Sequence, residues 1–171
     1  MRIAVLSDSH DHIPNLCRAV SLANAEQAEV LLHCGDLISP FMLKHLGRFQ
    51  GPVHLLYGNN AGDRHLIASR CGTIFTNIRH HGEYGTLTLG SLRIALHHYP
   101  DLARTVARSG EYDLVCYGHD HIFHCERIGN CTLLNPGDLL GAEATPGFVL
   151  FDSKTGSTRR IEVGEQMTIE P

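Results

Sequence analysis

The feature that most constrains the fold of this chain is a series of short apolar runs, each followed by an Asp, Asn or His residue. Runs at residues 2–6, 30–33, 53–57, 92–97 and 114–117 are each short and apolar enough to form a buried strand. The motifs at their ends are Asp8-Ser9-His10, Gly35-Asp36, Gly58-Asn59, His97-His98 and Gly118-His119-Asp120-His121. Loops at the carboxyl ends of strands in an open α/β sheet converge. The sequence therefore predicts that these side chains meet at one site.

The first third of the chain alternates predicted strands and helices. A helix is expected to begin near Pro14, because apolar residues recur at helical spacing as far as Ala23. Ser39-Pro40 is interpreted as an N-cap and first-turn proline that open a helix extending to about Arg48. The resulting β-α-β-α-β order is typical of parallel strands joined by crossover helices.

The later part of the chain favours antiparallel hairpins. They are predicted around three turns: Gly90-Ser91, Gly129-Asn130 and Lys154-Thr155-Gly156. A further helix is expected at residues 100–109, with Gly110 as its stop. These patterns predict two packed sheets with helices outside, in a single domain over residues 1–171.

Composition narrows the class of protein. Of 171 residues, 43% are hydrophobic and 19% charged, which excludes a disordered chain or a coiled coil. The net charge of −4 disfavours sequence-independent nucleic-acid binding, which needs a surplus of cations. No apolar run approaches the ~18 residues of a membrane span, and the first apolar run is too short for a signal peptide. We expect a cytoplasmic protein with a small-molecule substrate, and the sequence leaves its oligomeric state open.

Cysteine and histidine usage points to a metal site built without thiolates. The six cysteines include no C-x-x-C pair, and several lie in apolar runs, which favours buried free thiols over disulfides or a structural zinc. The 13 histidines are an excess that this interpretation leaves unexplained. Histidine is the commonest metal-ligating side chain, so the strand-end motifs are the natural place for that role.

Seven strand-end residues have the oxygen or nitrogen atoms that first-row metal ions bind. They are Asp8, His10, Asp36, Asn59, one of His97 and His98, His119 and His121. Such a set suits Mn, Fe, Zn or similar ions. Seven ligands exceed what one ion uses alongside substrate and water. With one bridging carboxylate they suit two ions roughly 3.5–4 Å apart, an arrangement that clamps a phosphoryl group.

The order of these motifs resembles the calcineurin-like metallophosphoesterase family, whose pattern is D-x-H, G-D, G-N, H and G-H-x-H. Together with Asn135-Pro136-Gly137 and the chain length, they look most like its small single-domain phosphodiesterase branch. The resemblance covers about residues 1–152 and rests on five motifs in order. It implies an α/β (α+β) fold, a four-layer α-β-β-α sandwich of two mixed sheets flanked by helices.

The resemblance also implies roles for individual residues. Carried over by position, the family pattern assigns Asp8, His10 and His121 to one ion and Asn59, His98 and His119 to another, with Asp36 bridging. Asp36, Asn59 and His98 are expected to be catalytic. Two divalent ions, Mn first and Fe, Zn or Ni as alternatives, would generate a shared hydroxide for in-line attack on phosphorus.

One departure from the family pattern concerns the leaving group. Many relatives have G-N-H-[DE] where this chain has Gly58-Asn59-Asn60, and an asparagine cannot act as a general acid. Asn60 is instead expected to hydrogen-bond a phosphate oxygen, and His12 to contact substrate. Three possibilities remain for the leaving group. Asp63 or His65 acts as its general acid, or the enzyme requires leaving groups of low pKa that need no acid.

The second departure is the pair His97-His98, where only one residue should bind metal. Alignment with the H-Y-P pattern of small relatives selects His98 and leaves His97 as a neighbour. His33, at the end of an apolar run, is expected to be a packed residue that supports the site.

Three functions are compatible with these motifs. The leading hypothesis is a two-metal phosphoesterase, most consistent with a phosphodiesterase. The rival is a non-catalytic binding module like the retromer subunit that shares this fold, since fold alone does not fix function. Complete occupation of the ligand positions favours the enzyme. A mononuclear hydrolase not specific for phosphate is the third.

Overall fold

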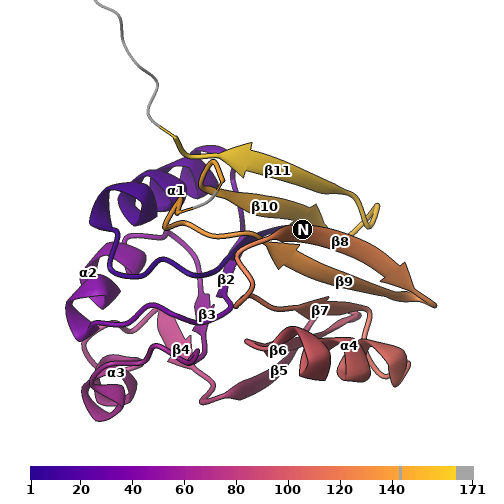
Figure 1. Cartoon of the computed structure of the whole chain (residues 1–171), viewed down its shortest axis with the longest axis horizontal. Helices are drawn as coiled ribbons and strands as arrows, with labels where there is room; N and C mark the ends of the chain where they lie inside the picture. The colour runs from indigo at the N-terminus through magenta and orange to yellow at the C-terminus, as the bar shows by residue number, and fades with distance from the viewer. Residues whose placement is uncertain (143, 165–171) are drawn as a thin grey trace, which may run out of the picture.

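Two mixed β-sheets form the centre of the computed structural model, which describes residues 1–142 and 144–164 (Figure 1). The first sheet is built from β1 (Arg2–Leu6), β2 (Val30–His33), β3 (Val53–Leu55), β4 (Ile78–His80), β10 (Gly147–Asp152) and β11 (Thr158–Glu162). Its strand order is β11-β10-β1-β2-β3-β4, and β1 to β4 are parallel. β10 is antiparallel to β1 and to β11.

The second sheet comes mainly from the middle of the chain. It contains β5 (Tyr84–Leu89), β6 (Leu92–His97), β7 (Leu114–Cys116), β8 (Phe123–Ile128) and β9 (Cys131–Pro136). The order is β5-β6-β7-β9-β8, with parallel pairs β6/β7 and β7/β9 inside antiparallel outer pairs. The three predicted hairpins are therefore confirmed.

The helices lie outside the sheets (Figure 1). They are α1 (Ile13–Ala25), the short 3₁₀ helix η1 (Pro40–Met42), α2 (Leu43–Leu46), α3 (Arg64–Arg70) and α4 (Pro100–Arg108). In the described ranges no helix is long and apolar enough to cross a membrane. The predicted domain extends to residue 171, and residues 165–171 lie outside the described part.

Alternation along the central strands explains the layers. Ile3 and Val5 of β1 pack in a core between the two sheets, whereas Ala4 and Leu6 pack in a second core with α1 and α2. In the second sheet, Ala95 of β6 faces α4, and its neighbours Ile94 and Leu96 face the first sheet. Side chains of successive strand residues point to opposite faces, so each central strand serves two cores. The expected four-layer α-β-β-α sandwich is confirmed.

Some local predictions were wrong or incomplete. The single helix expected from residues 39–48 is divided into η1 and α2, and Ser39 makes no side-chain cap. Instead the Ser39 hydroxyl and backbone N–H both donate to the carboxylate of Asp11. α3 and β4 were not predicted.

Candidate active site

Strand pairing brings the predicted motifs to one edge of the molecule. Leu6 pairs with His33, and His33 pairs with Leu55, so β1, β2 and β3 end side by side. The Asp8 N–H donates to the Gly35 carbonyl at 3.1 Å. From the second sheet, the backbone N–H of His119 donates to Asp8 Oδ2 at 3.0 Å. Both sheets thus contribute loops to the same place.

One group of predicted ligands surrounds Asp8, which is completely buried. The Nε2 atoms of His10 and His121 lie 3.2 Å apart. Asp8 Oδ1 lies 3.7 Å from His10 Nε2 and 3.5 Å from His121 Nε2. These three residues therefore present ligand atoms to a common point.

A second group surrounds the side-chain oxygen of Asn59. Its Oδ1 lies 2.8 Å from His98 Nε2 and 2.7 Å from His119 Nδ1. The three residues come from loops that follow β3, β6 and β7. They form the second set that the family pattern assigns.

Asp36 lies between the two groups. Its Oδ2 is 3.4 Å from His10 Nε2, and its Oδ1 is 3.6 Å from His98 Nε2. The side chain is 2% exposed. The two carboxylate oxygens of Asp36 therefore lie toward different groups, Oδ2 toward His10 and Oδ1 toward His98.

The donor and acceptor pattern fits cations in both groups. Asp8 Oδ1 is buried and has no hydrogen-bond partner among the described residues. His98 Nδ1 lies 2.8 Å from the Cys34 carbonyl, which can only accept. If the His98 ring is neutral, its proton is on Nδ1 and its Nε2 can only accept. That Nε2 faces the side-chain oxygen of Asn59, which is also an acceptor. A divalent cation would satisfy acceptors that otherwise face one another.

Burial and neighbouring charges set the pKa values around this site. Burial pushes the pKa of Asp8 upward, but contacts with His10, Ser7 and His98 and the His119 N–H outweigh it, so the pKa is lowered. The nearby Asp8 carboxylate, and to a lesser degree that of Asp36, raises the pKa of His10. Burial lowers the pKa of His33 to about 4, and its neutral Nε2 lies 3.1 Å from Ser9 Oγ. His33 is thus a packed residue that supports the Asp8 loop.

Backbone conformation at the site is unusual. Of the eight non-glycine residues with positive φ in ranges 1–142 and 144–164, five are predicted ligands: Asp8, His10, Asp36, His119 and His121. Asp and His adopt this region more readily than most residues, at a cost of about 1–3 kcal/mol each. Strain of this kind clusters at functional sites, and here it directs the side chains inward.

Two glycines leave the space that the carboxylates occupy. A Cβ at Gly58 would lie 2.0 Å from Asp36 Oδ1, and a Cβ at Gly118 would lie 2.4 Å from Asp8 Oδ2. Any side chain there would displace a predicted ligand. The G-N and G-H-x-H motifs therefore need glycine for close approach.

The two adjacent histidines have different surroundings. His98 is 1% exposed and lies among the predicted ligands. His97 Nδ1 accepts a hydrogen bond from the Tyr99 N–H, and its ring lies beside Tyr84 and Tyr99. The structure thus brings His98, and not His97, to the ligand cluster.

The expected substrate contacts have structural partners of their own. Asn60 donates to both oxygens of Asp36, from its backbone N–H at 2.7 Å and its amide at 2.8 Å. The His12 side chain caps α1 by accepting from the Asn15 N–H. Asp63 caps α3 by accepting from the Leu66 N–H.

Asp138 also belongs to the site, although the strand-end motifs did not predict it. Its Oδ2 lies 3.1 Å from His121 Nδ1, and it is 1% exposed. A carboxylate on Nδ1 orients a histidine so that Nε2 faces the metal. The available signal was its position directly after Asn135-Pro136-Gly137, at the end of β9.

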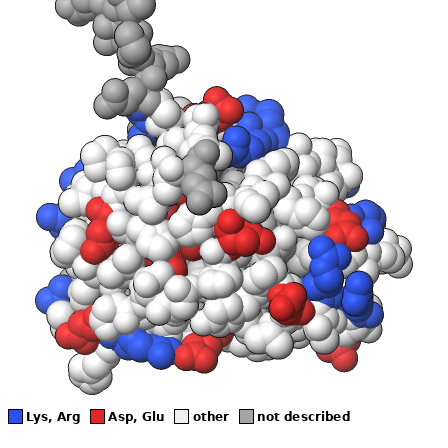
Figure 2. All heavy atoms as spheres, in the orientation of Figure 1, with Lys and Arg blue, Asp and Glu red and all other residues white. Residues whose placement is uncertain are grey.

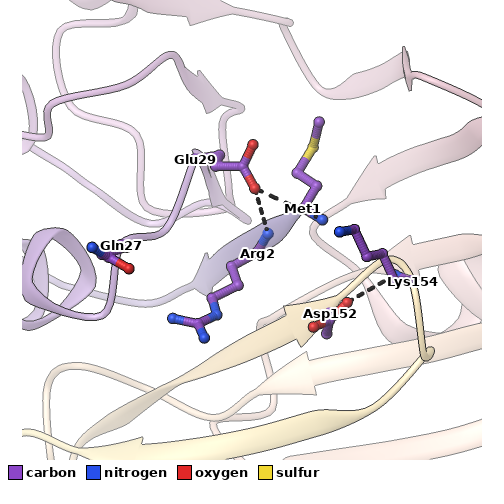
Figure 3. Close-up of a pocket in the computed structure, with 6 residues that line it drawn as sticks. All are labelled: Met1, Arg2, Gln27, Glu29, Asp152 and Lys154. Carbon is purple, nitrogen blue, oxygen red and sulfur yellow. Dashed lines mark hydrogen bonds and ion pairs between the residues drawn. The ribbon is translucent and has the colours of Figure 1, made fainter.

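Two cavities differ in their relation to these residues. One of about 290 Å³ shares Asn59 and His98 with the ligand cluster. Another of about 400 Å³ lies at the opposite end of β1, beside Met1 and Arg2 (Figure 3). There the backbone N–H of Arg2 donates to Glu29 and that of Lys154 donates to Asp152, so these polar groups satisfy one another (Figure 3). Only the first cavity adjoins the site.

Surface charge is mixed. Figure 2 shows acidic and basic side chains scattered over the face in view, not collected into one basic surface. The net charge of the chain disfavours sequence-independent binding of nucleic acid, and this stays a prediction from composition.

Comparison with known proteins identifies the family. Residues 1–156 match the model of the calcineurin-like phosphoesterase superfamily domain. The chain is 30% identical over 165 residues to phosphodiesterase MJ0936 of Methanocaldococcus jannaschii, covering 94% of this chain and 98% of that protein.

Solved structures agree. An archaeal phosphodiesterase superposes with a TM-score of 0.88 at 28% identity, covering 95% of this chain and 99% of the other. Vps29 of Entamoeba histolytica, in complex with Zn²⁺, shares the fold with a TM-score of 0.68 at 19% identity, covering 96% and 100%. The chain belongs to the calcineurin-like phosphoesterase superfamily, in its phosphodiesterase branch, and is a phosphoric ester hydrolase.

Proposed function

We propose that this enzyme is a phosphodiesterase that uses two divalent ions bridged by Asp36. The observation that carries the proposal is the placement of Asp36, whose two oxygens face His10 and His98 at 3.4 and 3.6 Å. Asp8, His10 and His121 would hold one ion, and Asn59, His98 and His119 the other. When bound, such ions lower the pKa of water and offset phosphoryl charge, which favours in-line attack of hydroxide on phosphorus.

The chain's own residues would fix the geometry of this reaction. Asp138 orients His121, and the Cys34 carbonyl orients His98. Asn60 restrains Asp36 through two hydrogen bonds, and its amide is also placed to donate to a phosphate oxygen. We also assign His12 to substrate contact, since only its Nδ1 is used in capping α1.

Metal identity and cellular location belong to the same proposal. A shell of Asp, Asn and His accepts several first-row ions, so we propose manganese, with iron, zinc or nickel as alternatives. The expected substrate is a small phosphoester. A cytoplasmic location remains a prediction from the sequence.

The alternative function is a non-catalytic binding module on the same fold. The Vps29 structures resemble this chain in fold, and one of them was obtained with Zn²⁺. Metal binding alone therefore does not distinguish an enzyme from a scaffold, whereas hydrolysis of a phosphodiester does.

A hydrolysis assay tests the proposal. The substrates are bis(para-nitrophenyl) phosphate and the matching monoester, each with manganese, nickel, zinc, magnesium or EDTA. We expect diester hydrolysis with manganese, its loss in EDTA, and a fall of about a hundredfold or more in Asp36→Asn, because one shared ligand serves both ions. Asp101→Asn, which changes an exposed residue of α4, is the matched control and should retain the wild-type rate.

Metal analysis accompanies the rates. The wild type should bind about two ions per chain, as the dinuclear arrangement requires. Equal rates in wild type and Asp36→Asn would refute the proposed mechanism, and metal binding without turnover would favour the scaffold.

A further inference from the structure

The cavity that adjoins the ligand cluster is placed to receive part of a substrate. Its volume is about 290 Å³, and its walls include Asn59 and His98. A group attached to phosphorus at the cluster would therefore lie next to this cavity. Its volume lies near the lower end of small-molecule sites, which suits one ring system better than a long chain.

The wall next to the cluster is aromatic and aliphatic. Tyr99 is 40% exposed and Leu102 is 52% exposed, although both are large apolar residues. The Tyr99 ring meets those of His98 and His119 edge-on, with centroids 5.3 and 5.0 Å away. Its position beside the predicted ligands is thus fixed by packing. An exposed apolar surface that adjoins a polar site is a common mark of ligand binding.

A cation that is already paired also lines the cavity. Arg64 lies over the Tyr57 ring, 4.3 Å from its centroid, and forms an ion pair with Glu83. All three residues line the cavity. Because the guanidinium is matched by the Glu83 carboxylate, this part of the lining gives little attraction for a second anionic group. The cavity therefore favours an uncharged ring.

We propose that this cavity is a subsite for an uncharged aromatic ring, and that the substrate is a phosphodiester of nucleotide type whose base stacks against Tyr99 and packs on Leu102. The inference rests on the proposed function, because the phosphoryl group must lie at the ligand cluster for the base to reach the cavity.

Binding to the manganese-loaded protein tests the subsite without turnover. Titration calorimetry compares adenosine monophosphate, ribose phosphate and inorganic phosphate. The first two differ by the base, so the ratio of their dissociation constants reports the ring alone. Stacking of a base on an aromatic side chain gives about tenfold or more in affinity. We expect adenosine monophosphate to bind about tenfold more tightly than ribose phosphate.

Four variants locate the effect. Tyr99→Ala and Leu102→Ala should reduce the ratio to about threefold or less, while Tyr99→Phe keeps the ring and the ratio. Phe41→Ala removes an aromatic residue that is 46% exposed outside the cavity, and it should leave the ratio unchanged. Inorganic phosphate affinity should be the same in all variants, which shows that the ligand cluster is intact. Leu102→Ala also guards against an indirect effect of Tyr99 on His98 and His119.

The outcomes separate the two proposals. Equal binding of adenosine monophosphate and ribose phosphate, with diester hydrolysis intact, overturns the subsite alone. A ratio that survives both Tyr99→Ala and Leu102→Ala also overturns it, because the base then binds elsewhere. A wild-type protein that neither binds phosphate nor hydrolyses diesters refutes the proposed function, and the subsite with it.

Discussion

His97 and His98 are neighbours in the chain, yet they contact different parts of the molecule. His98 Nε2 lies 3.6 Å from Asp36 Oδ1, whereas His97 Nδ1 accepts from the Tyr99 N–H. We predict that His98→Gln lowers manganese content by about one ion per chain, because one ligand set loses its buried nitrogen. His97→Gln should retain the full content. Elemental analysis of loaded, desalted protein measures both.

The same pair of variants provides its own control. Each replaces a histidine by glutamine at adjacent positions, so a general loss of folding would affect circular dichroism and not metal content alone. If His97→Gln lost the ion and His98→Gln kept it, the ligand assignment would be reversed.

Residue type and position after a strand together predicted much of this site. Asp8, His10, Asp36, Asn59, His119 and His121 were proposed from their positions after strands, and the structure brings them together. The contacts of Asn60 with Asp36 and of Asp138 with His121 were not predicted. They depend on side-chain directions that follow from loop conformation, which strand patterns do not specify.

At the scale of elements, α3 depends on its cap. The helix has seven residues, and Asp63 Oδ1 accepts from the Leu66 N–H at 2.8 Å. We predict that Asp63→Ala lowers the free energy of unfolding by about 1 kcal/mol, because an N-terminal N–H loses its acceptor. Urea unfolding followed by circular dichroism measures the change.

Asp63→Asn is the control, since asparagine caps about as well as aspartate. A loss in Asp63→Asn equal to that in Asp63→Ala would show that charge, not capping, is what Asp63 contributes. The helix also carries Arg64, which lines the proposed subsite.

The elements that the sequence did not predict, α3 and β4, are short, and β4 depends on contacts with residues far away in the chain. β4 has three residues at a sheet edge, and only Ile78 of them is buried. Just before it, Asn77 donates its amide to the Gly47 and Phe49 carbonyls, which lie 30 and 28 residues earlier in the chain. Local sequence does not contain those partners. By contrast, the hairpin at Gly90-Ser91 and the helix after Pro100 follow from local turn and helix-start signals.

For the whole molecule, buried histidines couple stability to pH. Burial lowers the pKa of His54 on β3 to about 4, and its Nδ1 lies 2.8 Å from His81 Nε2. The folded pKa lies below the unfolded value of 6.5, so folding favours the neutral ring. This contribution is complete above pH 6.5 and is lost as the pH falls toward 4. Acidification should therefore destabilise the protein.

We predict that His54→Gln reduces the loss of unfolding free energy between pH 7 and pH 5 by about 2 kcal/mol, because the variant no longer titrates there. Urea unfolding in EDTA at both pH values measures it, so that bound metal does not contribute. His65→Gln, which changes an exposed histidine, should keep the wild-type difference. Parallel pH dependence in wild type and His54→Gln would contradict the assignment.

The sequence by itself determined the layers and the chemistry of the site. Alternation within short strands sets which residues are buried on each face, and the Asp, Asn and His residues that follow the strands set which ligands are available. The tertiary structure decided which histidine of the pair enters the cluster, which side chains orient the ligands, and that a cavity with Tyr99 and Leu102 adjoins it. Those features arise from contacts between loops of two sheets, and such contacts exist only after the sheets have packed.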